Sequence, residues 1–448
     1  MSQSRKRPRP ASGQHGGARR PNQPNRLPDQ SLAELLGLAA ARTTSPATTA
    51  ARTTPAPAAP PRPPARPAPV PAAPIAVPTL AKIAGSPNPA TGLEFVTTPF
   101  RALADLEPQA VAVSYWFTPP AGPNPYQVAI RFTGHRLDVA GPRTPADDFV
   151  LTSEVSDVAP ASGPIVVTQR TAGTAAGRWS VTAEAQANPQ RAAGSTPVRL
   201  PPAAGTGQSV YAPIAAMRAP GVLIGSWPAM VALGFLLGLL VQGLLARVHT
   251  LPTGPVLTLS LLAGALGLAG AKTYYRLTHR HEPRTTWLAG LSVQGFVVAA
   301  TAVFILGGWW WGVPIGHLLD ASIPALLTGQ AVGRLGCLFA GCCNGLPTRS
   351  RWAIWSSDRR VGTRRIPVQL LESSSAALLA LLTGLIAWRT PPQQAGYLFL
   401  GGLAAYVIVR QVLFPLRGLA RVTRHGRAVM LVLAPLALAA AVLVPALT

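Results

Sequence analysis

Seven long apolar runs after residue 218 constrain this chain more than any other feature of its sequence. A membrane-spanning helix needs about 20 mainly apolar residues, and each run is at least that long and carries almost no charge. Inside lipid, a single segment can satisfy its own backbone hydrogen bonds only as a helix. We therefore predict an all-α membrane domain of seven helices over residues 219–448. The runs are Ala219–Ala246, Thr250–Ala271, Thr285–Leu319, Asp320–Cys343, Pro367–Trp388, Ala395–Phe414 and Ala428–Leu447.

Residues 1–85 have a different composition, which is rich in Pro, Ala and Arg and poor in aromatic residues. Such a segment buries too little apolar surface to offset the backbone entropy lost on folding, so we predict a disordered tail. Twelve basic residues from Arg5 to Lys82 face only Asp29 and Glu34. This charge is compatible with attraction to anionic lipid or nucleic acid, and also with a solvated tail. We expect no nucleic-acid partner.

Residues 86–190 alternate apolar and polar side chains in short runs separated by Pro, Gly and Asp. One run places Val111, Val113, Tyr115 and Phe117 on the same side of the chain. This period of two is typical of antiparallel strands, so we predict a small all-β sandwich of immunoglobulin-like form. The segment holds no catalytic constellation, and we interpret it as an interaction or spacer module. Residues 191–218 would then link it to the membrane domain.

A few charged side chains lie within or beside the predicted spans. Arg334 is the only charged residue in the segment 321–348, and an arginine at the bilayer centre costs about 2.5–3.5 kcal/mol on insertion scales. Such a residue usually faces a polar cavity or a partner. These charges either pair and lock the helices together or form a site for an anionic phospholipid headgroup, in which carboxylates orient arginines or transfer protons. The charged residues are Lys272, Asp320, Arg334, Glu372 and Arg410.

All three cysteines of the chain, Cys337, Cys342 and Cys343, follow Arg334 closely in a segment rich in glycine. Three interpretations remain open. A metal site would need four ligands, and three thiols with no nearby histidine supply only three. A disulfide from Cys337 to either of the others is compatible with an oxidising environment, although a five-residue spacing on a helix separates two thiols. The thiols would otherwise pack as small apolar groups. We expect no metal and no cofactor.

Five collinear motifs resemble those of the bacterial prolipoprotein diacylglyceryl transferases. Any one of these motifs is weak, but their order and spacing agree with the family over residues 222 to about 418. The family patterns are Gly-Arg-x-Gly-Asn, Asp-x-x-x-Pro, Gly-x-Ser-x-His-Gly, Pro-Ser-Gln-Leu-Tyr-Glu and Tyr-x-x-x-Arg-x-x-x-Glu-x-x-Arg. They correspond here to Gly333–Gly336 with Cys337, Asp320–Pro324, Gly290–Gly295, Pro367–Glu372 and Tyr406–Arg417.

The resemblance implies a reaction, a fold and a set of site residues. The family transfers the diacylglyceryl group of phosphatidylglycerol to the cysteine thiol of a prolipoprotein precursor and releases glycerol phosphate. Arg334 and Arg410 match the two essential arginines of the family, and we assign them to headgroup binding and to stabilising the leaving phosphate. The expected catalytic residues are Arg334, Arg410, Glu372 and Cys342, and the expected substrate-binding residues are Arg334, Arg410, Gln294, Asp320, Gln369, Cys337 and Lys272.

The chain departs from the family at positions that handle protons. Gln294 replaces the motif histidine and cannot accept a proton at physiological pH, while Cys337 and Cys342 replace an asparagine and a glutamate. Two further departures are Phe414 for a glutamate and Trp227 for a tyrosine. The lipid-binding half of the site is retained, and the proton-handling half is rebuilt or lost. Cys342, Cys343 and Glu372 are the candidate replacements for the missing base.

These departures leave more than one function open. We expect a multi-pass protein of the bacterial plasma membrane that acts on phosphatidylglycerol, prolipoproteins and membrane lipids. The alternative is a catalytically silent relative that binds anionic phospholipid or a membrane partner, and a third interpretation is a membrane thiol oxidoreductase, although no Cys-x-x-Cys pair accompanies the cluster.

The orientation in the membrane is predicted differently by charge and by family. Arginines concentrate in the loops after the second, fourth and sixth spans, and the positive-inside rule would place those loops and the N-terminus in the cytoplasm. The family resemblance implies the opposite orientation, with the N-terminus outside, although the first thirty residues lack a signal-peptide pattern. We favour the family orientation.

Overall fold

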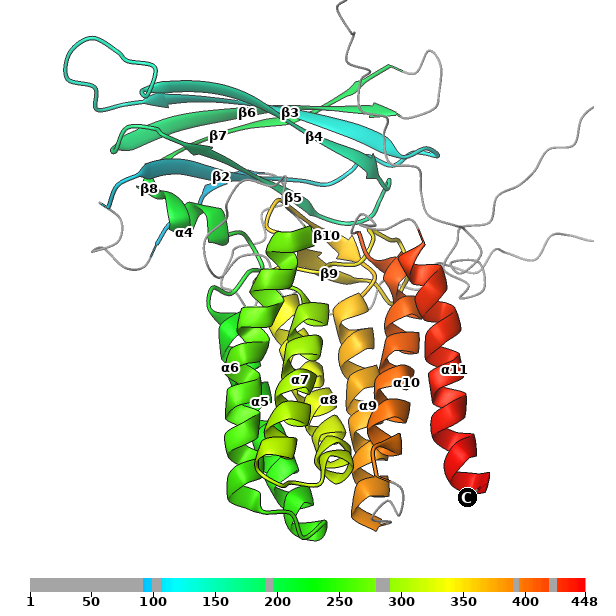
Figure 1. Cartoon of the computed structure of the whole chain (residues 1–448). Coiled ribbons are helices and arrows are strands. Elements are labelled where there is room, and N and C mark those ends of the chain that lie inside the picture. The colour runs from blue at the N-terminus through cyan, green and yellow to red at the C-terminus, as the bar shows by residue number, and fades with distance from the viewer. Residues whose placement is uncertain are drawn as a thin grey trace, which may run out of the picture. The chain divides into compact units, whose positions relative to one another are not determined.

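The computed structural model describes residues 92–98, 106–189, 196–278, 291–389, 395–418 and 425–447. The predicted tail over residues 1–85 lies outside these ranges. Seven helices are long and apolar enough to cross a membrane, which confirms the predicted number of spans within the described residues. Figure 1 shows them as a group of neighbouring helices. They are α5 (Ser226–Val248), α6 (Thr253–Thr278), α7 (Val293–Trp310), α8 (Ile315–Ala340), α9 (Val368–Arg389), α10 (Tyr397–Leu413) and α11 (Gly426–Leu447).

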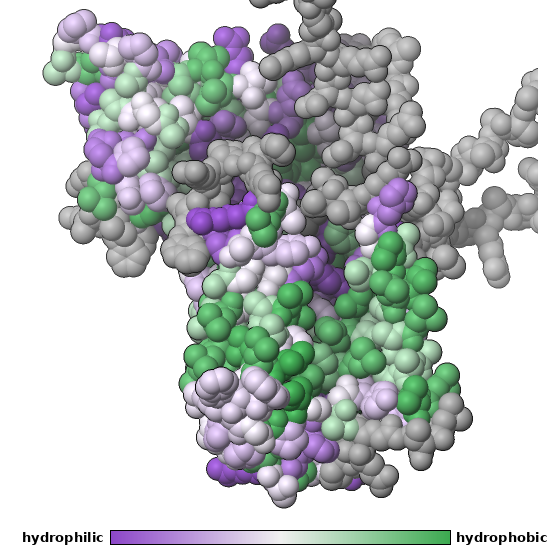
Figure 2. Space-filling model, viewed as in Figure 1, coloured by the Kyte–Doolittle hydropathy of each residue, from purple (hydrophilic) through white to green (hydrophobic). Residues whose placement is uncertain are grey.

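Apolar side chains occupy large areas of the visible face of the helices in Figure 2, mainly above their lower ends. Many large hydrophobic residues remain exposed on them, such as Leu236 on α5, Leu381 on α9 and Leu436 on α11. A water-facing surface rarely carries so continuous an apolar area, so these faces are the ones that contact lipid. The chain is therefore a multi-pass membrane protein.

Helix α8 is the most buried of the seven helices in the described region, and it packs against α5 and α9. Small residues allow the close approach to α5, because a Cβ atom built on Gly234 would lie 2.9 Å from the carbonyl oxygen of Gly329. A Cβ on Gly238 would likewise lie 3.0 Å from the carbonyl oxygen of Ala325. Such small-residue contacts are a common basis of helix association in membranes.

The predicted boundary between the third and fourth spans is wrong. Helix α7 ends at Trp310 and α8 begins at Ile315, so Asp320 lies inside α8 instead of at its start. Gly312 has φ +64° and Pro314 precedes the first residue of α8. A left-handed glycine and a proline without a backbone N–H together end one helix and start the next. Neither residue is charged, which is why counting charges did not locate the turn.

Two β-sheets precede the membrane helices, and Figure 1 shows them as separate layers. One sheet contains β1 (Gly92–Phe95), β2 (Gln109–Phe117), β5 (Ile165–Ala172) and β8 (Val210–Tyr211). The other has the order β4 (Asp148–Val158), β3 (Tyr126–Arg136), β6 (Arg178–Pro189) and β7 (Val198–Gln208). Side chains from both sheets form one apolar core that includes Tyr115, Phe132 and Trp179. The predicted all-β sandwich is confirmed.

The linker predicted over residues 191–218 is wrong where the structure describes it. Strand β7 pairs with β6 along its length, and β8 and the short helix α4 (Ala212–Met217) follow. The sequence of β7 contains Pro201 and Pro202 among Ala and Gly residues, so it lacks the apolar alternation of a strand. Proline is tolerated there because β7 is at the edge of its sheet.

The arginine-rich segment between α8 and α9 forms a hairpin that extends the first sheet. Strand β9 (Ile354–Ser357) pairs with β10 (Val361–Arg365), and β10 pairs with β5 of the sandwich. Trp355 stacks on Trp116 with 5.7 Å between ring centroids and donates a hydrogen bond of 3.0 Å to the carbonyl oxygen of Pro164. The sandwich therefore contacts the segment that follows the end of α8.

Candidate active site

A buried ion-pair cluster joins three segments of the membrane domain. Arg334, near the end of α8, pairs with Glu372 on α9 at 3.0 Å between Nε and Oε2. The other carboxylate oxygen of Glu372 accepts a hydrogen bond from Arg417, which follows α10 and the short 3-10 helix Phe414–Leu416. The side chains of Arg334, Glu372 and Arg417 are 7%, 5% and 3% exposed. One carboxylate thus fixes the position of two arginines.

Arg410 adds a third cation to the cluster. It lies on α10, close enough to Arg334 and Arg417 for their charges to repel. Its Nη1 atom is buried and has no hydrogen-bond partner among the residues that the structure describes. Glu372 pairs with Arg334 and Arg417, and no other carboxylate of the described residues pairs with these three arginines. A buried excess of positive charge is costly unless an anion compensates it, so the cluster is suited to bind a phosphate group through guanidinium forks.

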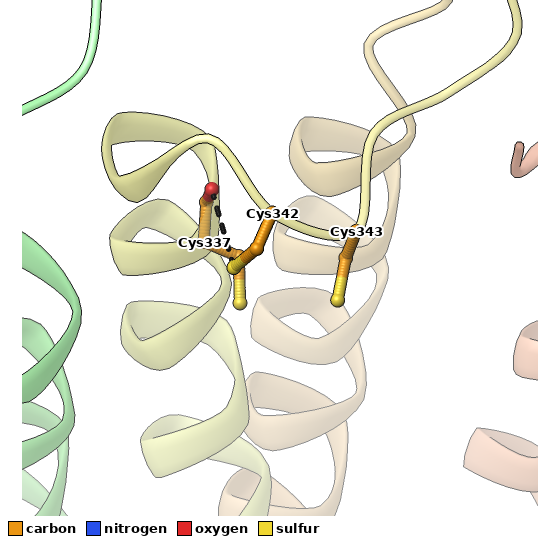
Figure 3. A group of neighbouring side chains, drawn as sticks. All are labelled: Cys337, Cys342 and Cys343. Atoms are coloured by element: carbon orange, nitrogen blue, oxygen red, sulfur yellow. Dashed lines mark hydrogen bonds between the residues drawn. The ribbon is translucent and has the colours of Figure 1, made fainter. Parts of the chain in front are cut away.

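A tight loop after α8 carries Cys342 and Cys343 beside the arginines. Helix α8 ends at Ala340 and is followed by Gly341 with φ +67°, and Cys343 also has a positive φ of 56°. The backbone N–H of Cys342 donates to the carbonyl oxygen of Cys337 at 3.1 Å, which turns the chain back over the last helical turn. Figure 3 shows the resulting arrangement, in which the thiol of Cys342 is directed toward Cys337 and Cys343 follows along the loop. A non-glycine residue in the left-handed region persists only where its surroundings hold it there.

Two amide side chains hold this loop in place. Gln369 donates through Nε2 to the carbonyl oxygen of Cys342 at 3.0 Å and to Oδ1 of Asn344 at 2.7 Å. Asn344 in turn donates through Nδ2 to the carbonyl oxygen of Ser357 on β9 at 3.1 Å. Gln369 is 1% exposed, so its contacts position the loop.

The three Sγ atoms lie within 4.8 Å of one another. The expectation that the five-residue spacing separates Cys337 from Cys342 is wrong, because the helix ends at Ala340 and the loop reverses direction. All three cysteines are free. Hydrogen bonds from the Cys337 and Cys342 thiols, together with the positive charges of Arg334 and Arg417, lower the pKa of the Cys343 thiol. The loop therefore favours a thiolate next to the arginines.

Three of the residues expected in the site have other surroundings. Asp320 is fully buried and accepts hydrogen bonds from the backbone N–H groups of Gly396 at 2.7 Å and Phe399 at 2.8 Å, which caps the start of α10. It precedes Arg334 by fourteen residues, a rise of about 21 Å along a helix. Lys272 is buried on α6 with its Nζ 5.9 Å from the ring centroid of Tyr275.

Gln294 is exposed at the start of α7, where its Oε1 accepts a hydrogen bond of 2.8 Å from Ser292. Within the described ranges, no hydrogen bond or ion pair joins Gln294 or Asp320 to the arginine cluster.

The expected site residues did not include Arg417, which the sequence analysis placed among the loop arginines after the sixth span. The available signal was its position as the last residue of the Tyr406–Arg417 motif. The structure brings it to Glu372 because Phe414–Leu416 forms a 3-10 turn and the backbone of Arg417 bridges to Gly345. Arg417 is therefore part of the same cluster as Arg334.

The described residues define a multi-pass membrane protein with a buried arginine cluster beside three thiols. A family model described as prolipoprotein diacylglyceryl transferase matches residues 214–445, which is more than half of the chain. The chain belongs to the prolipoprotein diacylglyceryl transferase family.

Individual relatives are similar over a shorter stretch. A phosphatidylglycerol–prolipoprotein diacylglyceryl transferase of Parasynechococcus marenigrum is 29% identical over 133 residues, which covers 28% of this chain and 48% of that protein. A protein of the same name from Dehalococcoides mccartyi is 31% identical over 125 residues, or 27% of this chain and 47% of its own length. The chain spans about half the length of the curated relatives it matches.

Proposed function

We propose that this protein transfers the diacylglyceryl group of phosphatidylglycerol to the thiol of a prolipoprotein cysteine, in the plasma membrane of a bacterium. The arginine cluster is the observation that carries the proposal. Arg334 and Arg417 share one carboxylate, and Arg410 lies beside them with an Nη1 atom that has no partner among the described residues. A phospholipid phosphate supplies the anion that this arrangement lacks.

The arginines then act on the leaving group. Attack of the precursor sulfur on the terminal glyceryl carbon forms an S–C bond and breaks the C–O bond to the phosphate, so glycerol phosphate leaves with additional negative charge. Arg334 and Arg410 stabilise that charge as it develops, because they are fixed before the reaction starts. Glu372 orients Arg334 and Arg417, since both of its oxygens are engaged by them.

The proton of the precursor thiol needs an acceptor near this cluster. Gln294 has no basic group and lies apart at the start of α7, and the carboxylate of Glu372 is held between two arginines. The loop cysteines are next to the same arginines, because Arg334 and Arg417 act on the Cys343 thiol. We assign activation of the incoming thiol to the cysteine cluster, in which Cys337 and Cys342 stand where the family has an asparagine and a glutamate.

The test is transfer of labelled diacylglycerol from phosphatidylglycerol to a precursor peptide with a lipidation cysteine. Arg410→Ala is the preferred variant, because Arg410 is outside the Arg334–Glu372–Arg417 ion pairs and its loss leaves them intact. We expect a loss of about a hundredfold or more, in the range for one transition-state donor. Arg389→Ala, which removes an exposed arginine at the end of α9, is the matched control and should transfer at the wild-type rate.

Two outcomes would contradict the proposal. Equal rates for Arg410→Ala and wild type would remove the arginine cluster from the reaction. Binding of phosphatidylglycerol by the wild type without any transfer would show that the protein is a silent member of the family.

A further inference from the structure

We propose that Cys337, Cys342 and Cys343 bind a Zn²⁺ ion through three thiolates and leave its fourth position open for the thiol of the precursor. This inference rests on the proposed function and specifies how the incoming sulfur is activated. It replaces the expectation of a metal-free site, which depended on three thiols being one ligand short of four.

The positions of the thiols fit a shared ligand. All three Sγ atoms lie within 4.8 Å of one another, and in Figure 3 all three lie below the loop. Zinc–sulfur bonds of about 2.3 Å in a tetrahedral arrangement place sulfurs roughly 3.8 Å apart. Contraction by about 1 Å lies within the reach of side-chain torsions on a fixed backbone.

The loop is built as a fixed support. Gln369 and Asn344 hold its backbone, and Cys343 is kept in a left-handed conformation that a free loop would leave. Packing alone does not explain the cysteines, because Cys342 and Cys343 are only partly buried. A disulfide between any two of the three would leave the third thiol without a role.

The number of ligands distinguishes the kind of metal site. Structural zinc sites are closed by four protein ligands, whereas catalytic zinc sites have three and leave one position for water or substrate. Within the described residues, the group of ligand atoms consists of these three thiols and no fourth. Three protein ligands are too few for a structural zinc site, but they are the number that a catalytic zinc site has.

The charges around the cluster also fit. Three thiolates and one Zn²⁺ carry a net charge of −1, and Arg334 and Arg417 act electrostatically on Cys343 from beside the site. Buried charges persist when opposite charges compensate them. The negative charge of the zinc–thiolate group would thus partly compensate Arg334 and Arg417. Arg410 would remain available to bind the lipid phosphate.

The step that follows is balanced without another reactant. The precursor thiol binds the open position and releases its proton to water, because coordination to zinc deprotonates a thiol. Its sulfur then attacks the glyceryl carbon, the S–C bond forms, and the electron pair of the broken C–O bond leaves on glycerol phosphate. The thioether product is neutral and holds zinc weakly, so it dissociates. This chemistry supplies what Gln294 cannot, since no side-chain base is needed.

The first experiment measures metal directly on the full-length protein in detergent with phosphatidylglycerol. We expect about one zinc per chain by elemental analysis, and thiolate-to-metal charge-transfer absorption when Co²⁺ replaces zinc. Cys343→Ser should weaken zinc binding by more than about a hundredfold, beyond the usual loss from an outer-shell partner. Cys337→Ser and Cys342→Ser should do the same. Arg410→Ala is the matched control, because it should lose transfer and keep the metal.

A second measurement tests the open position. Adding the precursor peptide should change the visible spectrum of the cobalt protein, and a peptide with serine in place of its cysteine should not. Zinc binding without transfer would support the metal site and refute the proposed function. Transfer at an unchanged rate after chelation to less than about a tenth of a zinc per chain would support the function and refute the metal. Reversible disulfide formation by metal-free wild type, with no binding of zinc, would also overturn the inference.

Discussion

Replacing Glu372 by glutamine tests the central ion-pair arrangement. Glu372 is 5% exposed and contacts both Arg334 and Arg417. Glutamine keeps the shape of the side chain and removes its charge, so three buried guanidinium groups would lose their only described carboxylate. Removing one partner of a buried pair costs about 3–5 kcal/mol. For a domain of this size we expect the melting temperature to fall by about 6–20 °C, at roughly 2–4 °C per kcal/mol.

The assay is thermal unfolding of the detergent-solubilised protein, followed by tryptophan fluorescence and by circular dichroism. Asp148→Asn is the matched control. Asp148 pairs with Arg143 at 2.7 Å, and the two side chains are 39% and 49% exposed. Loss of the charge of this exposed pair should therefore cost about 1 kcal/mol or less. If Glu372→Gln melts within about 2 °C of the wild type, the carboxylate does not balance the arginines and our reading of the cluster is wrong.

Three further predictions concern residues outside the ion pairs. Asp320→Ala should lower stability by about 0.5–2 kcal/mol through loss of the helix cap, while the folded variant retains transfer; a selective loss of transfer would instead make Asp320 part of the site. Gly345→Ala should abolish transfer, because a Cβ there would collide with the carbonyl oxygen of Ile366. Gly384→Ala meets only an ordinary contact at 3.7 Å and should retain the wild-type rate. Burial raises the pKa of Tyr115 to about 12, so stability should fall as pH rises from about 10 to about 12. Tyr115→Phe should lose that part of the pH dependence in denaturant titrations.

The sequence predicts the membrane helices well because lipid leaves an apolar run few alternatives to a helix. The sequence does not predict β7, because Pro201 and Pro202 are unusual in a strand. The segment forms an edge strand through its pairing with β6. The sequence also does not predict the hairpin β9–β10, whose arginines resemble a membrane-flanking loop. Strand β7 is stabilised by pairing with the preceding strand β6, and β10 by pairing with the distant strand β5. Neither pairing leaves an alternating apolar pattern in the strand itself.

The candidate site was likewise predicted only in part from the sequence. Arg334, Glu372 and Arg410 are identified by charge within apolar sequence, and the structure brings them together. Charge alone also selects Asp320, which caps α10 instead. It does not select Arg417, because arginines are common in the loops that follow membrane spans and Arg417 lies just beyond the sixth span. The proximity of the three thiols depends on where α8 ends, and a difference of one helical turn would separate them.

The pairing of β10 with β5 has a consequence for synthesis. The hydrogen bond between Trp355 and Pro164 joins residues 191 positions apart in the chain. At translation rates of about 5–20 residues per second, β5 is made roughly 10–40 seconds before its partner. During that interval its exposed edge is open to pairing with other chains. Strand β10 can pair with β5 only after the four helices between the sandwich and the hairpin have been inserted, with the hairpin on the same side of the membrane as the sandwich. Formation of this pairing therefore requires correct insertion of the first half of the membrane domain.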